Sequence, residues 1–303
     1  MKYNRRVALG ALAAGLTAGW TQADENKASA DSHSPWGPLC VFAKPLQMLS
    51  FSELADLLVS QQWDGIEATV RKGGQVEPAK VADQLPKLVD ALAAKEKQVV
   101  LFASDVNSVD QRLTEPTLRA AAKAGIRYYR MAYYRYDLDQ PILPQLDKFT
   151  RQVEQLVQLN RELGITALYQ NHAGTRYCGA GLWDLYRIAA DQPKEQLAVA
   201  FDIRHATVEA GMSWPIHWSM LREHVGALYC KDFRWNEAKV ENVPLGSGLV
   251  ASSFYDALRK DPIAGIPVSV HMEYIDHRDP QLAAQRIAAV ADDRRAIRRL
   301  LGI

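Results

Sequence analysis

Three residues that could do chemistry follow one apolar run in the second half of the sequence. Residues 197–201 are Leu-Ala-Val-Ala-Phe, and Asp202, Arg204 and His205 come almost directly after them. An uninterrupted apolar run of this length predicts a strand that is buried on both faces. A carboxylate, a guanidinium and an imidazole at its end could bind a metal ion, hold an oxyanion or transfer a proton. The alternative is a strand that simply exits to solvent.

Polar endings of the same kind recur on other apolar runs. Carboxylates, imidazoles and a carboxamide suit a divalent cation, whereas lysine and arginine suit an oxyanion or a carbonyl oxygen. Each group also has a structural explanation: Lys231 and Asp232 could form a surface ion pair, and His271 could be a core histidine. The residues at these run ends are Lys44, Glu67, Arg71, Arg130, Tyr133, Gln170, Asn171, His172, Asp202, Arg204, His205, Lys231, Asp232, His271 and Glu273.

Eight strands that alternate with eight helices would bring these run ends together. We predict strands over 38–44, 65–71, 98–103, 126–134, 165–170, 197–205, 226–232 and 267–273, and helices over 50–62, 78–95, 113–124, 145–163, 182–190, 214–224, 252–260 and 279–301. This alternation predicts an α/β protein, a single closed (β/α)8 TIM barrel over 38–303, with the polar run ends around one mouth. No glycine-rich phosphate loop follows the first strand, which argues against a dinucleotide-binding fold.

The N-terminus predicts export. Residues 1–23 begin with Lys2, Arg5 and Arg6, continue with an apolar Ala/Gly-rich run and end with small residues that suit a signal-peptide cleavage site. The arginine pair resembles a twin-arginine signal. A Sec signal or an uncleaved anchor remains an alternative. Residues 24–37 read as a polar linker. We therefore expect a periplasmic protein without stable membrane insertion, because the apolar run is too short for a comfortable span.

Charge and cysteine content exclude further classes of protein. Removing the three cations of residues 1–23 from the formal charge of +1 leaves −2, which offers no basic field for nucleic acid. Cys40, Cys178 and Cys230 are odd in number and fit no zinc motif, so we expect buried thiols. A bridge from Cys178 to a neighbouring molecule stays open, and the oligomeric state is not predicted.

Motifs over almost the whole mature chain resemble one known family. They are YQNH at 169–172, GA at 179–180 with WDL at 183–185, FDIRHATVE at 201–209, SWP at 213–215, KDFRW at 231–235, PLGSG at 244–248 and HMEY at 271–274. With these motifs, the chain resembles the xylose-isomerase-like TIM barrel superfamily of sugar phosphate isomerases and epimerases, which also contains endonuclease IV. Within it, the motifs resemble a secreted bacterial subgroup.

The resemblance implies a divalent metal, such as manganese or a zinc-like ion, held by Glu, Asp, His and Glu from strands five to eight. By motif, Asp202 matches the aspartate and Glu273 the last glutamate. Gln170 stands in place of the first glutamate, and Tyr229 in place of the histidine. His271 or His172 could supply the missing nitrogen. The predicted metal ligands are therefore Gln170, Asp202, His271 and Glu273.

Catalytic and substrate-binding roles follow from the resemblance and from the run ends. His205 matches a histidine that contacts substrate, Glu273 is a catalytic carboxylate, and Lys231 is the best acid/base candidate if burial lowers its pKa. Tryptophans that follow strand ends could stack on sugar rings or simply pack against the barrel. The predicted substrate-binding residues are Lys44, Glu67, Arg71, Arg130, Asn171, His172, Arg204, Trp183 and Trp235.

Three functions remain open from the sequence. The first is a sugar isomerase or epimerase that removes a proton α to a carbonyl and stabilises the enediolate, with a lyase on 3-keto-glycosides as a variant with the same first step. The second is a carbohydrate-binding barrel without catalysis, favoured by Gln170 and Tyr229. The third is a DNA-repair nuclease, disfavoured by export, by the negative mature charge and by the sparse ligand set. The expected partner is thus a small carbohydrate, unphosphorylated because the protein is exported, and not a nucleic acid.

Overall fold

A computed structural model describes residues 34–303 of the chain. The predicted export signal over 1–23 lies outside the described residues, and so does the predicted linker up to residue 33. Within the described part of the chain, no helix is both long enough and apolar enough to cross a membrane.

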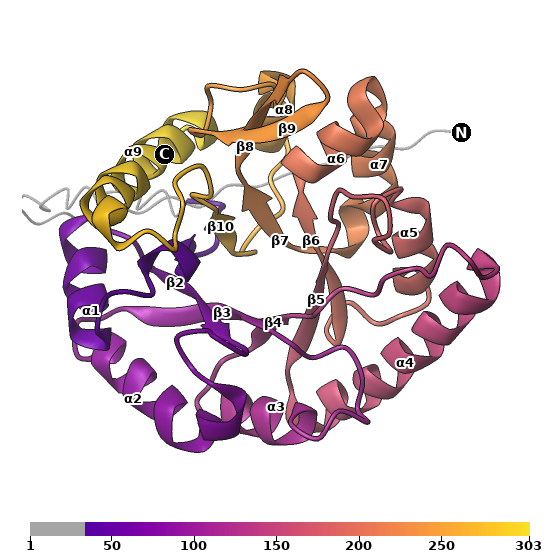
Figure 1. The fold of residues 1–303 in the computed structure, drawn as a ribbon, viewed down its shortest axis with the longest axis horizontal. Helices are drawn as coiled ribbons and strands as arrows, with labels where there is room; N and C mark the ends of the chain where they lie inside the picture. Colours follow the sequence, from indigo (N-terminus) through magenta and orange to yellow (C-terminus); the bar gives the residue numbers. More distant parts are fainter. Residues whose placement is uncertain (1–33) are drawn as a thin grey trace, which may run out of the picture. The chain divides into compact units, whose positions relative to one another are not determined.

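Eight parallel strands close into a barrel, as the sequence predicts. Their order around the barrel is β1-β10-β7-β6-β5-β4-β3-β2, so every strand lies beside its neighbour in the chain apart from the inserted pair described below. Figure 1 shows the helices as a ring outside these strands. The barrel strands are β1 (Leu39–Phe42), β2 (Gly65–Val70), β3 (Gln98–Ser104), β4 (Tyr128–Arg130), β5 (Thr166–Gln170), β6 (Leu197–Asp202), β7 (Val225–Cys230) and β10 (Val268–Val270).

The helices begin and end on local signals that the sequence contains. Ser50 and Glu53 form a reciprocal capping box at the start of α1, and Gly164 ends α4 with a left-handed φ of 66°. The helices are α1 (Phe51–Ser60), α2 (Val81–Ala93), α3 (Thr114–Lys123), α4 (Ile142–Leu163), α5 (Trp183–Ala189), α6 (Ile203–Ala210), α7 (Trp214–Leu221), α8 (Ser252–Lys260) and α9 (Ala283–Leu301), with 3₁₀ turns η1 (Lys44–Leu46), η2 (Pro78–Lys80), η3 (Gly211–Ser213), η4 (Arg222–His224) and η5 (Pro280–Leu282).

Three parts of the fold differ from the sequence prediction. The aromatic fourth strand is only the three residues of β4, because the chain beyond it leaves the ladder. The predicted sixth strand is too long: residues 203–205 belong to helix α6, which starts directly after β6, because the Asp202 carboxylate accepts a hydrogen bond from the His205 N–H and caps the helix. After β7, an antiparallel hairpin of β8 (Asp232–Asn236) and β9 (Lys239–Val243) is inserted, and both strands are labelled in Figure 1.

The barrel interior is packed by small and medium side chains below its mouth. This cluster contains Cys40, Val100, Leu101, Leu168, Ala198, Ala200, Ala227 and Tyr229. Because side chains alternate along a strand, the residue two positions beyond a cluster member also points to the barrel axis. That rule places Asp202 above Ala200, Lys231 above Tyr229 and Gln170 above Leu168.

The larger part of the core lies between the strands and the helices. Trp63, Tyr129 and Phe254 are among its fully buried side chains. All three cysteines, Cys40, Cys178 and Cys230, are buried free thiols, as expected.

Candidate active site

A cup of about 160 Å³ lies at the mouth of the barrel, on the carboxyl ends of its strands. The sequence prediction that distant polar run ends converge is met by nine of its lining residues: Lys44, Arg71, Arg130, Tyr133, Gln170, His172, Lys231, His271 and Glu273. Phe42 completes the lining. Phe42 and Tyr133 were missed as binding residues, although Tyr133 belongs to a polar run end in the sequence.

Lys231 lies between two carboxylates at the base of the cup. Its ammonium Nζ is 3.0 Å from Oε2 of Glu273 and 3.3 Å from Oδ2 of Asp202, and the residue is 5 % exposed. Burial alone would lower the pKa of Lys231, but the two carboxylates outweigh it and raise that pKa above the usual lysine value. The expectation that burial lowers this pKa is therefore wrong, and Lys231 is a fixed cation in the unliganded protein.

Asp202 is fully buried, and its position is fixed by its neighbours. Its Oδ1 accepts the His205 N–H at 3.0 Å, and its Oδ2 accepts the amide Nε2 of Gln170 at 2.7 Å. The fully buried Asn171 exchanges two hydrogen bonds with the Asp202 backbone, at 2.8 and 2.9 Å. Asn171 was predicted to bind substrate, but it lies behind Asp202 and orients that residue instead.

Glu67 lies under the cup and has no exposed surface. Its carboxylate accepts hydrogen bonds from Ser269 (2.6 Å), Tyr229 (3.1 Å) and Arg130 (3.3 Å) and contacts Nε2 of His271 at 2.8 Å. Burial would raise the pKa of Glu67, but these partners lower it overall. The structure thus corrects its predicted role: Glu67 holds the residues of the cup floor and does not reach a substrate.

The donor set does not fit the predicted metal ion. The ring nitrogen Nε2 of His271 is engaged by Glu67, and the ring stacks on Phe42 with centroids 4.5 Å apart. The Gln170 amide donates to Asp202 and accepts from the Tyr133 hydroxyl at 2.5 Å, so neither end is free. The carboxylates of Asp202 and Glu273 contact the Lys231 ammonium, which fills the space between them. Residues 34–303 hold no group of three or more His, Cys, Asp or Glu that could bind a metal.

His172 lines the cup and contacts His205 behind it, and the tautomers of both follow from their partners. The rings of His172 and His205 are 4.0 Å apart. Nδ1 of His172 lies 2.9 Å from the Ala173 carbonyl, which can only accept, so this nitrogen carries the proton. Nδ1 of His205 lies 2.9 Å from the Arg204 guanidinium, which can only donate, so the His205 proton is on Nε2. Burial, as the largest cause, lowers the pKa of His172 to about 4 and that of His205 well below its usual value.

This arrangement agrees with the predicted substrate-binding position of His172 and corrects the role predicted for His205. His205 is covered by His172 and is absent from the cup lining, so it is not the substrate contact expected from its motif. His172 lines the cup and keeps Nε2 as an unprotonated acceptor. Arg204 is buried beside His205 and over the Phe233 ring, 5.7 Å from its centroid, and does not line the cup either.

Cations dominate the wall of the cup. Lys44 Nζ lies 3.7 Å from Glu273, and Arg130 donates to the Tyr133 hydroxyl at 2.6 Å. Among the lining residues of the described chain, Glu273 supplies the one carboxylate. Burial would raise the pKa of Glu273, but Lys231 above all lowers it far below the usual value, so the group is an anion.

Two predicted tryptophans lie away from the cup. Trp183 begins α5, is 61 % exposed and meets the ring of His217 edge-on. Trp235 lies on β8, is 48 % exposed and packs edge-on against Phe233. Neither lines the cup, so the structure does not support sugar stacking on either ring at this site.

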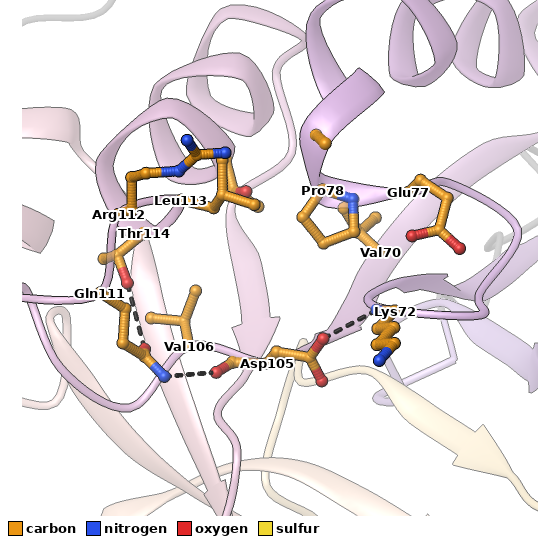
Figure 2. Close-up of a pocket in the computed structure, with 12 residues that line it drawn as sticks. Val70, Lys72, Glu77, Pro78, Asp105, Val106, Gln111, Arg112, Leu113 and Thr114 are labelled. Carbon is orange, nitrogen blue, oxygen red and sulfur yellow. Dashed lines mark hydrogen bonds between the residues drawn. The ribbon is translucent and has the colours of Figure 1, made fainter.

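Two other hollows lie near the strand ends. One, of about 390 Å³, shares Lys44 and Glu273 with the cup and continues along Asn242, His277 and Arg278. The other, of about 500 Å³, lies between the loops that follow β2 and β3 and is shown in Figure 2. Its apolar lining includes Val70 and Leu113, and it shares no residue with the cup.

Comparisons with known proteins agree with this architecture. The family model described as "Xylose isomerase-like TIM barrel" matches residues 56–300. No curated protein matches the sequence at a significant level.

Solved structures of low sequence identity share the fold. The 3-keto-D-glucoside 4-epimerase YcjR from E. coli is 15 % identical, with a TM-score of 0.61, over 86 % of this chain and 99 % of that one. The "probable 3-DHS dehydratase AsbF" from Bacillus anthracis is 13 % identical, with a TM-score of 0.64, over 84 % and 98 %. The IOLI protein, described with a bound zinc atom, is 14 % identical, with a TM-score of 0.66, over 88 % and 98 %.

Proposed function

Because the chain belongs to the xylose isomerase-like TIM barrel family, we propose that it removes a proton from the carbon α to the carbonyl of a sugar and stabilises the resulting enediolate. One observation carries this proposal: a single carboxylate, Glu273, faces the cup among Lys44, Arg71, Arg130 and Lys231. A base surrounded by cations suits a reaction in which negative charge moves from the base to a substrate oxygen.

Glu273 is the proposed base. In the unliganded protein its basicity is suppressed by the ion pair with Lys231 at 3.0 Å. A substrate carbonyl oxygen can accept a hydrogen bond from the Lys231 ammonium in competition with Glu273. As the C–H bond breaks, this competition weakens the ion pair, and Glu273 becomes more basic. The proton then moves to Glu273 and the C–H electron pair forms the enediolate, whose oxygen is stabilised by the cations. Return of the proton to the neighbouring carbon, with transfer of that carbon's hydroxyl proton to the enediolate oxygen, gives an isomer. Protonation of the original carbon from its opposite face, by a group other than Glu273, gives an epimer.

A lyase is the second candidate, and the hollow beside the cup favours it. The two spaces share Lys44 and Glu273, so a sugar ring in the cup can carry a substituent into the larger one. From the same enediolate, loss of a group on the β carbon would give elimination instead of reprotonation. Barrels of this fold carry the names of an epimerase and of a dehydratase, so the fold is compatible with either outcome.

The manganese or zinc-like ion expected from the sequence is not part of this mechanism, because the residues present do not fit it. We propose that the protein is exported to the periplasm on its twin-arginine-like N-terminus. Unphosphorylated sugars are then the expected substrates. Fractionation of cells that express the full chain, with a twin-lysine variant of Arg5 and Arg6 as control, tests this location.

Proton exchange in deuterated water tests the proposed reaction. We expect the protein to introduce deuterium at the α carbon of a ketose or a 3-keto-glycoside, followed by NMR, with the product distinguishing isomer, epimer and elimination. Glu273→Gln should reduce exchange by about 100-fold or more, and Asp202→Asn should reduce it strongly, while circular dichroism stays unchanged. Full activity in both variants would exclude this site, and sugar binding without exchange would make the protein a binding barrel.

A further inference from the structure

The two carboxylates that match metal ligands by motif converge on a single lysine nitrogen. Oδ2 of Asp202 and Oε2 of Glu273 both lie at ion-pair distance from the Lys231 ammonium, at 3.3 and 3.0 Å. Divalent cations bind carboxylate oxygens at about 2.0–2.6 Å, in the space that this ammonium fills. An ion there would also lie next to a buried positive charge, which is costly in a low-dielectric site.

The ligand set around this point is smaller than the one that the resemblance implies. The metal set implied by the resemblance has three carboxylates around a 2+ ion, a net charge of −1. In this chain Gln170 removes one carboxylate, and the two that remain, Asp202 and Glu273, flank the Lys231 ammonium. Tyr229, at the position of the implied histidine, directs its hydroxyl to Glu67 at 3.1 Å and so offers no ligand to the point. The departures from the motif are thus consistent with one another.

We propose that the ammonium group of Lys231 occupies the place of the divalent cation and polarises the substrate carbonyl in its stead. Lys231 lines the cup, so its nitrogen is in reach of a bound sugar. An ammonium carries three protons, and this one contacts two carboxylates, which leaves an N–H for a substrate oxygen. Lys231 keeps its proton throughout: it donates a hydrogen bond to the carbonyl and then to the enediolate oxygen, while Glu273 takes and returns the carbon-bound proton. This catalytic part rests on the proposed function, whereas the replacement of the ion does not.

Metal binding tests the replacement without any activity measurement. We expect the purified wild-type protein to carry no stoichiometric metal and to show no Mn²⁺ or Zn²⁺ binding at this site by calorimetry. Lys231→Ala should bind Mn²⁺ at least about tenfold more tightly, because two buried carboxylates then lack their partner. The gain should disappear in Lys231→Ala/Asp202→Asn. Lys44→Ala is the matched control, since it also removes a cation from Glu273 but keeps Lys231 in place.

A stoichiometric metal in the wild-type protein that depends on Asp202 and Glu273 would overturn the replacement, and so would equal Mn²⁺ binding by Lys44→Ala and Lys231→Ala. If Lys231→Ala does not fold, the wild-type metal content and the isosteric Lys231→Met variant decide the question.

Exchange in the presence of EDTA tests the catalytic part. We expect full exchange by metal-stripped wild-type protein, about a 100-fold or greater loss in Lys231→Met, and partial retention in Lys231→Arg, which keeps the charge. Exchange that requires added Mn²⁺ would overturn the inference while the proposed function stands. Absence of exchange with every sugar would remove the proposed function, and the metal-binding measurements would still decide whether Lys231 replaces the ion.

Discussion

At the scale of single residues, the two neighbouring histidines of the site allow a specific prediction of their protonation. His172 and His205 lie 4.0 Å apart, and their Nδ1 partners have opposite character, a carbonyl and a guanidinium. We expect both rings to be neutral at pH 7 with opposite tautomers, the proton on Nδ1 in His172 and on Nε2 in His205. NMR of ¹⁵N-labelled histidine, assigned with His172→Gln and His205→Gln, measures this directly.

The pH dependence of the same spectra has a definite sign. The pKa of His172 is lowered to about 4, so its neutral form is favoured by folding. Its ring signals should stay constant from pH 8 to pH 5 and change only below that range, whereas the unfolded protein titrates near 6.5. A cationic His172 at pH 6 would contradict the assignment of its Nε2 as an acceptor in the cup.

Single residues also show how far the sequence could predict this site. Asp202, Lys231 and Glu273 were found because a polar residue at the end of a buried strand has few structural reasons to be there. The role of Glu67 was not predictable, since its four partners come from β4, β7 and β10 or the residue just after it. The direction of the Lys231 pKa shift was wrong for the same reason: burial can be read from the pattern, but the two flanking carboxylates cannot.

At the scale of elements, the β8–β9 hairpin and the loop after it depend on one carboxylate. Asp232 accepts four backbone N–H groups: those of Phe233 (2.8 Å) and Val250 (3.0 Å) at Oδ1, and those of Gly246 (3.0 Å) and Gly248 (2.9 Å) at Oδ2. A Cβ on Gly248 would collide with this carboxylate and with the Phe233 carbonyl. Lys231 and Asp232 therefore do not act as a pair: Lys231 lines the cup, whereas Asp232 holds the backbone of the loop.

Asp232→Asn should destabilise the protein by about 2–4 kcal/mol, because its amide N–H₂ would face two backbone donors in a buried position. Urea denaturation measures this loss. The matched control is Glu241→Gln on the same hairpin, a half-buried partner of the exposed Arg234, which should change the midpoint little. Equal midpoints for Asp232→Asn and the wild type would show that the loop does not depend on this carboxylate.

The elements that the sequence did not predict share a physical cause. Helix α6 starts directly after β6 and the hairpin starts two residues after the end of β7, and in each place one carboxylate organises the backbone that follows. In the linear pattern Asp202 and Asp232 read as candidate site residues. Only the fold shows that both also serve as acceptors for local N–H groups, so a helix and a hairpin appear where connecting segments were expected.

At the scale of the whole molecule, closure of the barrel was predictable because it depends on repetition. Eight apolar runs with eight intervening amphipathic segments have few ways to bury every strand, and a closed parallel ring is the one that leaves no edge. The contents of the mouth depend instead on pairs of side chains from different strands, such as Lys231 with Glu273, and repetition carries no information about these pairs.

The buried carboxyl of Asp293 links the C-terminal helix to the loop after the hairpin and makes global stability depend on pH. It accepts the Leu245 N–H at 3.0 Å and the Tyr274 hydroxyl at 3.2 Å, and burial raises its pKa to about 6. Because the folded pKa lies above the usual value, its stabilising contribution is complete below about pH 4 and is lost as the pH rises through about 6. A shift of this size corresponds to roughly 1–3 kcal/mol.

Asp293→Asn keeps an acceptor for both donors and has no charge to bury. We expect the variant to be more stable than the wild type by about 1–3 kcal/mol at pH 7.5 and nearly equal at pH 4, measured by urea denaturation at both pH values. Asp292→Asn is the matched control on the same helix, because Asp292 is exposed and pairs with Arg295 on the surface. A difference between Asp293→Asn and the wild type that is the same at both pH values would mean that hydrogen bonding, and not the buried charge, sets the contribution of this residue.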